Sequence, residues 1–269
     1  MSTFLADGFR DVDGASDAGK LFGCLGFLDG VPDVRVYKER AIDALGLATD
    51  ARVADLACGM GFDLLRLHVR APLGRVVGFD ASAELVVAAR RQTAGCAGIE
   101  VRQADARAVE EPDGAFDGVR IDRSLQHIEN PARVVAEMAR LVRPGGAVSA
   151  CEPDWSSFHL SSDCSQPAAV VVRDWTAGFR NPLIGRQILD LLADRGLAIR
   201  DYFIQTLVLR SWPDADRVFD IAETVRRSTA GGAIDAAAGA RLLADLAERH
   251  ARGRFCATLA IHCVTGRKA

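Results

Sequence analysis

Apolar residues follow two alternating patterns through the first half of the 269-residue chain. Short apolar runs, typical of buried strands, alternate with longer segments whose apolar residues recur roughly every three or four positions, as on one face of a helix. The runs predict strands at about 52–57, 75–79, 99–103, 116–121 and 146–151. The segments between them predict helices at about 62–71, 82–94 and 131–142. This alternation is typical of a parallel sheet covered by helices.

The helix predicted at 131–142 has the clearest boundaries. Asn130 can cap its first turn, and Pro131 suits the first helical position because no backbone N–H is needed there. Its apolar face is expected to consist of Val134, Val135, Met138, Leu141 and Val142. The run Arg143-Pro144-Gly145-Gly146 then ends the helix and turns the chain into the next strand.

The second half of the chain is predicted to be more helical. We expect helices at about 166–178, 184–195, 213–229 and 235–251, and strands at about 198–209 and 255–265. The long interval between these last two strands holds two of the predicted helices. We therefore expect a helical insertion that lies over the ends of the strands.

The N-terminal region is also predicted to be helical. Residues 1–30 are apolar and rich in glycine, which favours one or two short helices. Residues 34–45 are predicted to form a helix whose inner side contains Val36, Ala41, Ile42 and Leu45. The expected organisation is a helical lid over 1–45 and a main domain over 46–269, with cap insertions at about 153–183 and 211–252.

The turn after the first strand is the clearest candidate for a ligand site. It reads Asp55-Leu56-Ala57-Cys58-Gly59-Met60-Gly61, and an amphipathic segment follows it. Gly59 and Gly61 permit backbone angles or close approaches that a side chain would forbid. Asp55 lies at the carboxyl end of the strand, where open α/β sheets bind ligands. The next strand ends in Asp80, whose carboxylate is well placed to accept hydrogen bonds from two ribose hydroxyls.

A dinucleotide site of the NAD type is the nearest alternative for this turn. That site requires the pattern G-x-G-x-x-G. Here the residue three positions after Gly61 is Leu64, so the pattern is not met.

The turn resembles that of the class I S-adenosylmethionine (SAM) dependent methyltransferases. In that family an acidic residue at the end of the first strand precedes G-x-G-x-G, and here Ala57 replaces the first glycine. The run Leu141-Val142-Arg143-Pro144-Gly145-Gly146 also resembles the family's turn before its fifth strand. The resemblance implies a Rossmann-like, doubly wound α/β fold with a helical cap. Its seven-stranded sheet would be mostly parallel, with the last strand antiparallel.

The resemblance also implies a set of cofactor-binding residues. The acid after the third strand, Asp105, would bind the adenine amino group, and Ala106 would donate a backbone N–H to the ring. The remaining cofactor residues would be Asp55, Ala57, Gly59 and Gly61 in the first turn, Asp80 and Ala81 at the ribose, Ile121 and Arg123 at the methionine end, and Tyr37 from the lid. No metal ligand is expected.

Several of these roles have structural alternatives. Arg123 could neutralise the methionine carboxylate, since a guanidinium pairs with carboxylates through two hydrogen bonds, or it could pair with Asp122 or Asp55. Tyr37 and Arg40 could touch SAM from the lid, or they could be surface residues of an amphipathic helix.

Two residues are candidates for catalysis. His127 follows the fourth strand and, with an ordinary pKa of about 6.5, can accept a proton near neutral pH. The methyltransferase family has a site at this position that faces the acceptor in some members and packs structurally in others. Asp154, or else His159, could act as a base or orient the acceptor, and Trp155 could stack on it. A pocket wall with acids facing solvent is the alternative for these residues.

Composition bears on the ligands, the cysteine chemistry and the cellular location to be expected. The net charge of −3 gives no basic footprint for nucleic acid. Seven cysteines without a C-x-x-C pair predict free thiols rather than zinc ligands or disulfides. The first ten residues do not resemble a signal peptide, and no apolar run is long enough to cross a membrane. We therefore expect a cytoplasmic protein, with a homodimer left open.

The predicted function is transfer of a methyl group from SAM to a small, hydrophobic or aromatic metabolite. Within the family, the chain is similar to the enzymes of ubiquinone and menaquinone biosynthesis and to small-molecule methyltransferases of bacterial secondary metabolism. It is specific over about 50–155. A cyclase or cofactor-modifying enzyme with the same fold is one alternative, and a noncatalytic SAM-binding protein is another. The acceptor atom is not predicted.

Overall fold

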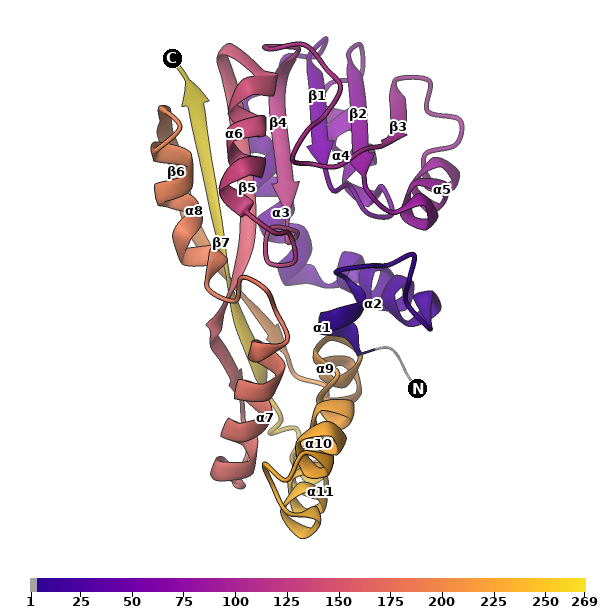
Figure 1. The fold of residues 1–269 in the computed structure, drawn as a ribbon, viewed down its shortest axis with the longest axis vertical. Helices are drawn as coiled ribbons and strands as arrows, with labels where there is room; N and C mark the ends of the chain where they lie inside the picture. The colour runs from indigo at the N-terminus through magenta and orange to yellow at the C-terminus, as the bar shows by residue number, and fades with distance from the viewer. Residues whose placement is uncertain (1–3) are drawn as a thin grey trace.

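Seven strands form one sheet in the order β3-β2-β1-β4-β5-β7-β6. The computed structural model describes residues 4–269 and is drawn in Figure 1. Neighbouring strands from β3 to β5 run parallel, whereas β7 runs antiparallel to both β5 and β6. The predicted fold class is therefore confirmed. The strands are β1 (Arg52–Leu56), β2 (Arg75–Asp80), β3 (Ile99–Gln103), β4 (Phe116–Asp122), β5 (Val142–Leu160), β6 (Leu197–Leu209) and β7 (Ala257–Lys268).

Helices cover both faces of the parallel part of the sheet. On one face, α3 (Pro32–Ala44), α4 (Phe62–Arg70) and α5 (Ala83–Gln92) bury apolar side chains such as Ile42, Leu64 and Val86. The opposite face carries α6 (Pro131–Leu141) and α8 (Ile184–Ala193). Because both faces are covered, the strands read as nearly continuous apolar runs in the sequence.

A second layer of helices lies beyond the carboxyl ends of β1, β2 and β4. There β5, β6 and β7 continue past the other strands, and the helices of this cap pack on the extension (Figure 1). The cap helices are α1 (Leu5–Gly8), α2 (Ala18–Gly30), α7 (Ser165–Ala177), α9 (Trp212–Phe219), α10 (Ile221–Ala230) and α11 (Ala236–Ala251). The last three lie between β6 and β7, as expected for the helical insertion.

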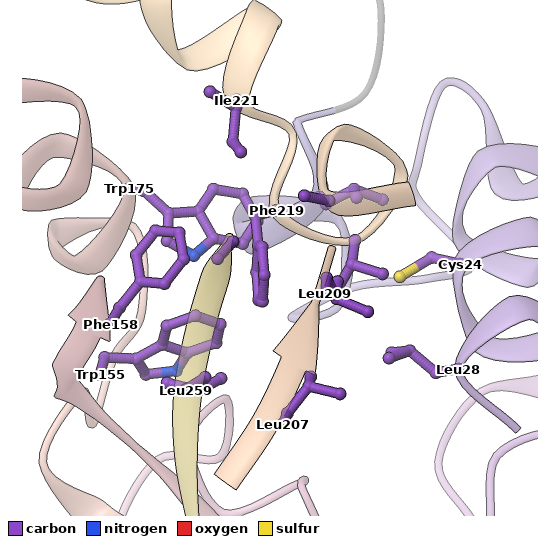
Figure 2. Close-up of a cluster of buried hydrophobic side chains, with 14 of the residues drawn as sticks. Cys24, Leu28, Trp155, Phe158, Trp175, Leu207, Leu209, Phe219, Ile221 and Leu259 are labelled. Atoms are coloured by element: carbon purple, nitrogen blue, oxygen red, sulfur yellow. The ribbon is translucent and has the colours of Figure 1, made fainter. Parts of the chain in front are cut away.

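The cap has its own apolar core, which joins segments far apart in the sequence. Figure 2 shows side chains converging from α2, β5, α7, β6, α9 and β7. Trp155 of β5 lies 5.7 Å from Trp175 of α7 and 6.1 Å from Phe219 of α9, measured between ring centroids. Edge-to-face contacts of this kind fix ring orientation as well as burying area. The cap therefore has a close-packed apolar core of its own, continuous with the extended strands of the sheet.

Three local predictions are wrong. The helix expected at 213–229 is broken at Asp220, which has φ of 46° and separates α9 from α10. The strand expected to end near 151 continues to Leu160. Val36, expected on the inner side of its helix, is 58% exposed because α3 packs through Val34, Ala41 and Ile42 instead.

Residues 1–3 of the expected lid lie outside the described residues. Over residues 4–269, no helix combines the length and apolarity that crossing a membrane requires.

Candidate active site

A cavity of about 460 Å³ lies between the strand ends and the cap. Its polar part is formed by residues at the carboxyl ends of β1, β2 and β4. Its apolar part, here called the aromatic chamber, is lined by Phe9, His127, Trp155, Trp175, Phe179 and Phe219. The volume falls in the range of cavities that hold cofactors and small ligands, roughly 300–1,000 Å³.

The turn after β1 has the backbone of a ligand cradle. Ala57, Gly59 and Gly61 all have positive φ, at 52°, 55° and 80°. A Cβ added at Gly59 would meet no atom within 4 Å, so the space beside this glycine is free for a ligand. At Gly61 a Cβ would come within 3.0 Å of Ala89, so that glycine is required by packing. Ala57 shows that one left-handed position tolerates a small side chain.

Asp80 joins this turn to the end of β2. Its Oδ2 accepts a hydrogen bond of 2.8 Å from the backbone N–H of Gly59, and its Oδ1 accepts one of 3.0 Å from Ser82. The carboxylate lines the cavity, and burial raises its pKa above the ordinary value. Asp80 therefore both fixes the turn and presents a carboxylate to a ligand.

Five buried charged residues lie beneath the turn and are called the charge cluster: Lys38, Asp55, Asp63, Arg120 and Asp122. Arg120 is fully buried, with its Nη1 3.1 Å from Asp55 and its Nη2 2.9 Å from Asp63. Lys38 reaches in from α3, with its Nζ 2.5 Å from Asp63 and 3.0 Å from Asp122. A third cation, Arg66 of α4, lies 2.9 Å from Asp63, so the three carboxylates are balanced by three cations. These ion pairs connect α3, α4, the end of β1 and β4.

The carboxylates of this cluster differ in their protonation. Burial raises the pKa of Asp55 to about 7, because the attraction of Arg120 only partly offsets the loss of hydration. The pKa values of Asp63 and Asp122 are lowered, because nearby cations outweigh the effect of their burial. Asp55 lines the cavity, and its Oδ2 has no hydrogen-bond donor among the described residues. It can therefore receive a cationic group from a ligand.

Arg123 and Tyr37 also line the cavity next to this cluster. The Tyr37 hydroxyl donates to both oxygens of Asp122, at 3.0 and 3.2 Å. The partner found for Asp55 is Arg120, not Arg123. Arg123 comes no closer to Asp122 than 3.7 Å, measured from its Nε to Oδ2. Of the two structural pairings considered for Arg123, the one with Asp122 is present as a long salt bridge, and the one with Asp55 is not found among the described residues.

His127 lies in the wall of the aromatic chamber. Its ring centroid is 5.6 Å from that of Phe9 and 5.5 Å from that of Phe179. No described residue forms a hydrogen bond with either ring nitrogen, and Nδ1 is fully enclosed. Burial, assisted by the positive charges of Arg10 and Arg123, lowers the pKa of His127 to about 3. The imidazole is therefore neutral at ordinary pH.

The segment that carries Arg123 and His127 is held by a buried carboxylate. Glu152 accepts backbone hydrogen bonds from Ser124 and Leu125, at 2.8 and 2.7 Å. Gln126 accepts a hydrogen bond of 2.7 Å from the indole of Trp155. These contacts set the position of the loop relative to the aromatic wall.

Asp154 is placed away from the cavity. Its neighbours in β5, Pro153 and Trp155, line the cavity, and Asp154 points to the opposite face of the sheet. There its Oδ2 receives the Arg186 guanidinium at 2.6 Å. His159 is exposed and does not line the cavity either. The expectation that Asp154 or His159 lies beside the acceptor is therefore corrected.

The predicted cofactor residues mostly converge. Those that line the cavity are Tyr37, Asp55, Ala57, Gly59, Asp80, Ala81, Asp105, Ala106 and Arg123. Gly61 lies behind the turn, and Ile121 is buried in the core between the sheet and α6. Asp105 lies at the rim, where Arg107 holds it with a 2.7 Å hydrogen bond. Arg40 does not line the cavity and instead pairs with Asp201 on β6.

The N-terminal segment 4–17, called the strap, crosses the cavity. Leu5 and Phe9 line its inner surface. At one end the Leu5 N–H donates to Asp220 at 3.1 Å. At the other end Asp13 accepts hydrogen bonds from the backbone of Ala83 at 2.8 Å and of Glu84 at 3.2 Å, at the start of α5. Sequence reasoning missed Asp13, as it missed Lys38, because no local pattern marks either residue.

Comparison with known proteins identifies the domain. Residues 53–146 match the methyltransferase domain family, and this range contains the turn, Asp80 and the strand-end acids described above. The chain carries a class I SAM-dependent methyltransferase domain. Its relatives include the demethylmenaquinone methyltransferase of Thermus thermophilus, 37% identical over 118 residues, which are 43% of this chain and 53% of that protein.

Two other similarities extend beyond the domain. A 37.1 kDa protein encoded in transposon TN4556 of Streptomyces fradiae is 36% identical over 232 residues, covering 86% of this chain and 66% of that protein. The structure of a putative methyltransferase from Bacillus halodurans superposes with a TM-score of 0.61 at 18% identity, over 86% of this chain and 98% of the other. The chain spans about half the length of the curated methyltransferases it matches.

The residues present fit SAM, the cofactor of this methyltransferase domain. The free space beside Gly59 admits close approach of a ligand to the backbone. Asp80 supplies carboxylate oxygens for ribose hydroxyls, and Asp55 supplies one for an ammonium group. Carboxylate oxygens for the ribose hydroxyls and for the ammonium group of a SAM molecule thus lie around one turn.

Proposed function

We propose that this protein transfers a methyl group from SAM to a small, largely hydrophobic acceptor bound in the aromatic chamber. The observation that supports the proposal is the continuity of one cavity from the turn at 57–61 to the chamber. An acceptor in the chamber would face a cofactor seated on the turn without crossing bulk water. Exclusion of water strengthens the electrostatic interactions within such a site.

When bound, SAM supplies an electrophilic methyl group on a sulfonium. Asp80 would hold the ribose, and Asp55 would hold the ammonium group. Trp155 and Phe179, whose rings stack at 4.1 Å, would form a rigid wall that orients an apolar acceptor. Orientation of this kind is a large part of catalysis when two bound groups must align for an in-line displacement. His127 would accept a proton where the acceptor must lose one.

The direct test is incubation of the protein with methyl-labelled SAM and a panel of hydrophobic phenols, quinols and polyketide-like compounds. A product heavier by one labelled methyl group supports the proposal. Release of an isomerised acceptor without label would point instead to a cyclase. Cofactor binding with no change in any acceptor would point to a noncatalytic role.

Asp80→Ala is expected to weaken S-adenosylhomocysteine binding by about 1–3 kcal/mol, the usual cost of losing a charged hydrogen-bond partner. The variant also loses the two backbone contacts that fix the turn. Calorimetry gives the affinity, and thermal unfolding of the same preparation shows whether the turn alone has loosened. Asp80→Asn retains one acceptor oxygen and should fall between wild type and alanine. Unchanged affinity in a folded alanine variant would remove Asp80 from the ribose site.

Cofactor affinity is expected to rise with pH through about 7. Burial raises the pKa of Asp55 to about 7, so the carboxylate is protonated below that pH and charged above it. Only the charged form attracts an ammonium group, so affinity for S-adenosylhomocysteine should fall about tenfold between pH 8 and pH 6. Asp55→Asn should bind weakly and show little pH dependence. The control ligand, 5′-methylthioadenosine, lacks the amino acid and should bind equally at both pH values; a matching fall for both ligands would contradict the assignment.

A further inference from the structure

Arg123 differs from the other arginines that line the cavity. Arg10 donates to the carbonyl of Gly178, Arg107 to Asp105, and Arg120 to Asp55. Arg180 is the most exposed of the set and lies near Glu129. The Arg123 side chain is only 17% exposed, and no described residue accepts a hydrogen bond from its guanidinium.

The carboxylate nearest to Arg123 is already occupied. Asp122 receives the Tyr37 hydroxyl at 3.0 Å and Lys38 at 3.0 Å, and Arg120 lies 3.3 Å away. Its contact with Arg123 is 3.7 Å, beyond hydrogen-bond length. A guanidinium carries five N–H donors and keeps its charge, so leaving it buried without an acceptor is costly. An acceptor supplied by a ligand would remove that cost.

The backbone also presents Arg123 to the cavity. The residue directly follows β4 and has φ of 51°, an unusual conformation for a side chain of this size. Its N–H donates to the Cys151 carbonyl at 2.7 Å, which fixes the conformation. Such strained positions concentrate at binding sites, where surrounding contacts hold them in place.

The surroundings place the guanidinium at the junction of the two halves of the cavity. On the cofactor side lie Tyr37 and Asp122. On the cap side Arg123 acts electrostatically on His127 and on Cys24, which belongs to the apolar cluster of Figure 2. A group bound by Arg123 could therefore belong to a ligand in either half.

We propose that Arg123 binds an anionic oxygen of a ligand at this junction. Two sources share that chemistry: the methionine carboxylate of the cofactor, and a carboxylate or acidic hydroxyl on the acceptor. The naming of these ligands rests on the proposed function. The charge requirement itself rests on a guanidinium that has only a long salt bridge and no hydrogen-bond acceptor among the described residues, so the two can be tested separately.

The first arm of the test compares two cofactor-derived ligands by calorimetry. S-adenosylhomocysteine carries the amino-acid carboxylate, and 5′-methylthioadenosine lacks it. If Arg123 holds that carboxylate, Arg123→Met should weaken the first ligand about tenfold or more and leave the second unchanged. Arg123→Lys should recover part of the loss, because it restores the charge without the planar fork. Arg143→Met, which removes an exposed arginine paired with Asp117, is the matched control.

The second arm compares two probes of the acceptor chamber, 2-naphthoate and its neutral analogue 2-naphthamide. Binding is followed by quenching of tryptophan fluorescence, since Trp155 and Trp175 line the chamber. It is measured with and without S-adenosylhomocysteine, so the result does not depend on cofactor binding. If Arg123 serves the acceptor, wild type should prefer naphthoate about tenfold or more, and Arg123→Met should abolish the preference.

A selective loss in either arm supports the proposal and names the source of the anion. The proposal is overturned if folded Arg123→Met binds all four ligands as wild type does, or loses charged and neutral ligands equally. Failure of the proposed function would look different: wild type would then transfer no labelled methyl group to any acceptor, whereas the preference for charged ligands and its loss in Arg123→Met could still be measured.

Discussion

If His127 is the general base, its replacement by alanine is expected to lower kcat by roughly 10²–10⁴, the usual contribution of a general acid or base, while cofactor affinity stays near wild type. The imidazole lines the chamber between Phe9 and Phe179, and neither ring nitrogen has a hydrogen-bond partner among the described residues. With a pKa of about 3 the unliganded imidazole is a weak base, so a loss of this size requires the bound acceptor to raise that pKa. Single-turnover and steady-state rates with labelled SAM give kcat, and calorimetry gives the affinity.

The pH dependence of the reaction rate should distinguish His127 from a histidine with the ordinary pKa of about 6.5. Because burial and two neighbouring arginines lower its pKa to about 3, His127 is unprotonated throughout the working range. The rate should therefore not rise through a histidine pKa near 6.5, as the sequence alone would suggest. Any increase of the rate near pH 7 should instead reflect deprotonation of Asp55, and it should be absent in Asp55→Asn.

Two other outcomes would count against His127 as the base. If its role is packing, His127→Ala should melt at a lower temperature and keep most of its turnover once folded. If the acceptor atom is already electron-rich, alignment alone carries the reaction and His127→Asn should be tolerated. Near-normal kcat in either folded variant would end the base hypothesis.

The parts of the site that the sequence predicted are those fixed by local chain geometry. Gly59 and Asp80 each directly follow or end an apolar run, and parallel strands bring such positions to one edge of the sheet. The path of the chain from β1 to β2 is short and regular, so spacing along the sequence translates into position in space. Apart from Tyr37 of α3, the predicted residues that line the cavity belong to that stretch or to the equivalent ends of β3 and β4.

Asp154 shows how an error in strand length misplaces a side chain. A strand that ends near 151 would place residues 152–155 after its end, beside the acceptor. The strand continues, so side chains alternate between faces, and Trp155 enters the chamber while Asp154 points away. The strand extends because β7 pairs with it as far as Leu160, after a bulge between Asp154 and His159. That pairing involves residues about a hundred positions away and leaves no local signal.

The charge cluster could be only partly anticipated. Arg120 stands inside an apolar strand, and a charge at a position buried on both faces requires a partner. That signal was available in the sequence. Its partners were not, because Lys38 comes from the lid and Asp63 from the first turn of α4, and only tertiary packing brings them to Arg120.

Replacing Lys38 by methionine is expected to lower the free energy of unfolding by about 3–5 kcal/mol, the usual effect of removing one member of a buried ion pair. Lys38 is 5% exposed and supports two carboxylates, Asp63 and Asp122. Methionine fills similar space but supplies no charge, so Asp63 would keep only Arg66 and Arg120, and Asp122 would keep Arg120 as its nearest cation. Denaturant unfolding without cofactor gives the free energy directly.

The matched control is Arg252→Met, which breaks the exposed pair of Arg252 and Glu248 on α11. Exposed pairs of this kind contribute about 0–1 kcal/mol, so its unfolding should be nearly unchanged. A double-mutant cycle with Asp63→Asn then tests the cause, because residues that share one network are not additive. If Lys38 acts by balancing Asp63, the double variant should lose less stability than the sum of the two single losses. Additive losses, or a loss for Lys38→Met no larger than that of the control, would show that the carboxylates under the turn do not depend on the lid for their charge balance.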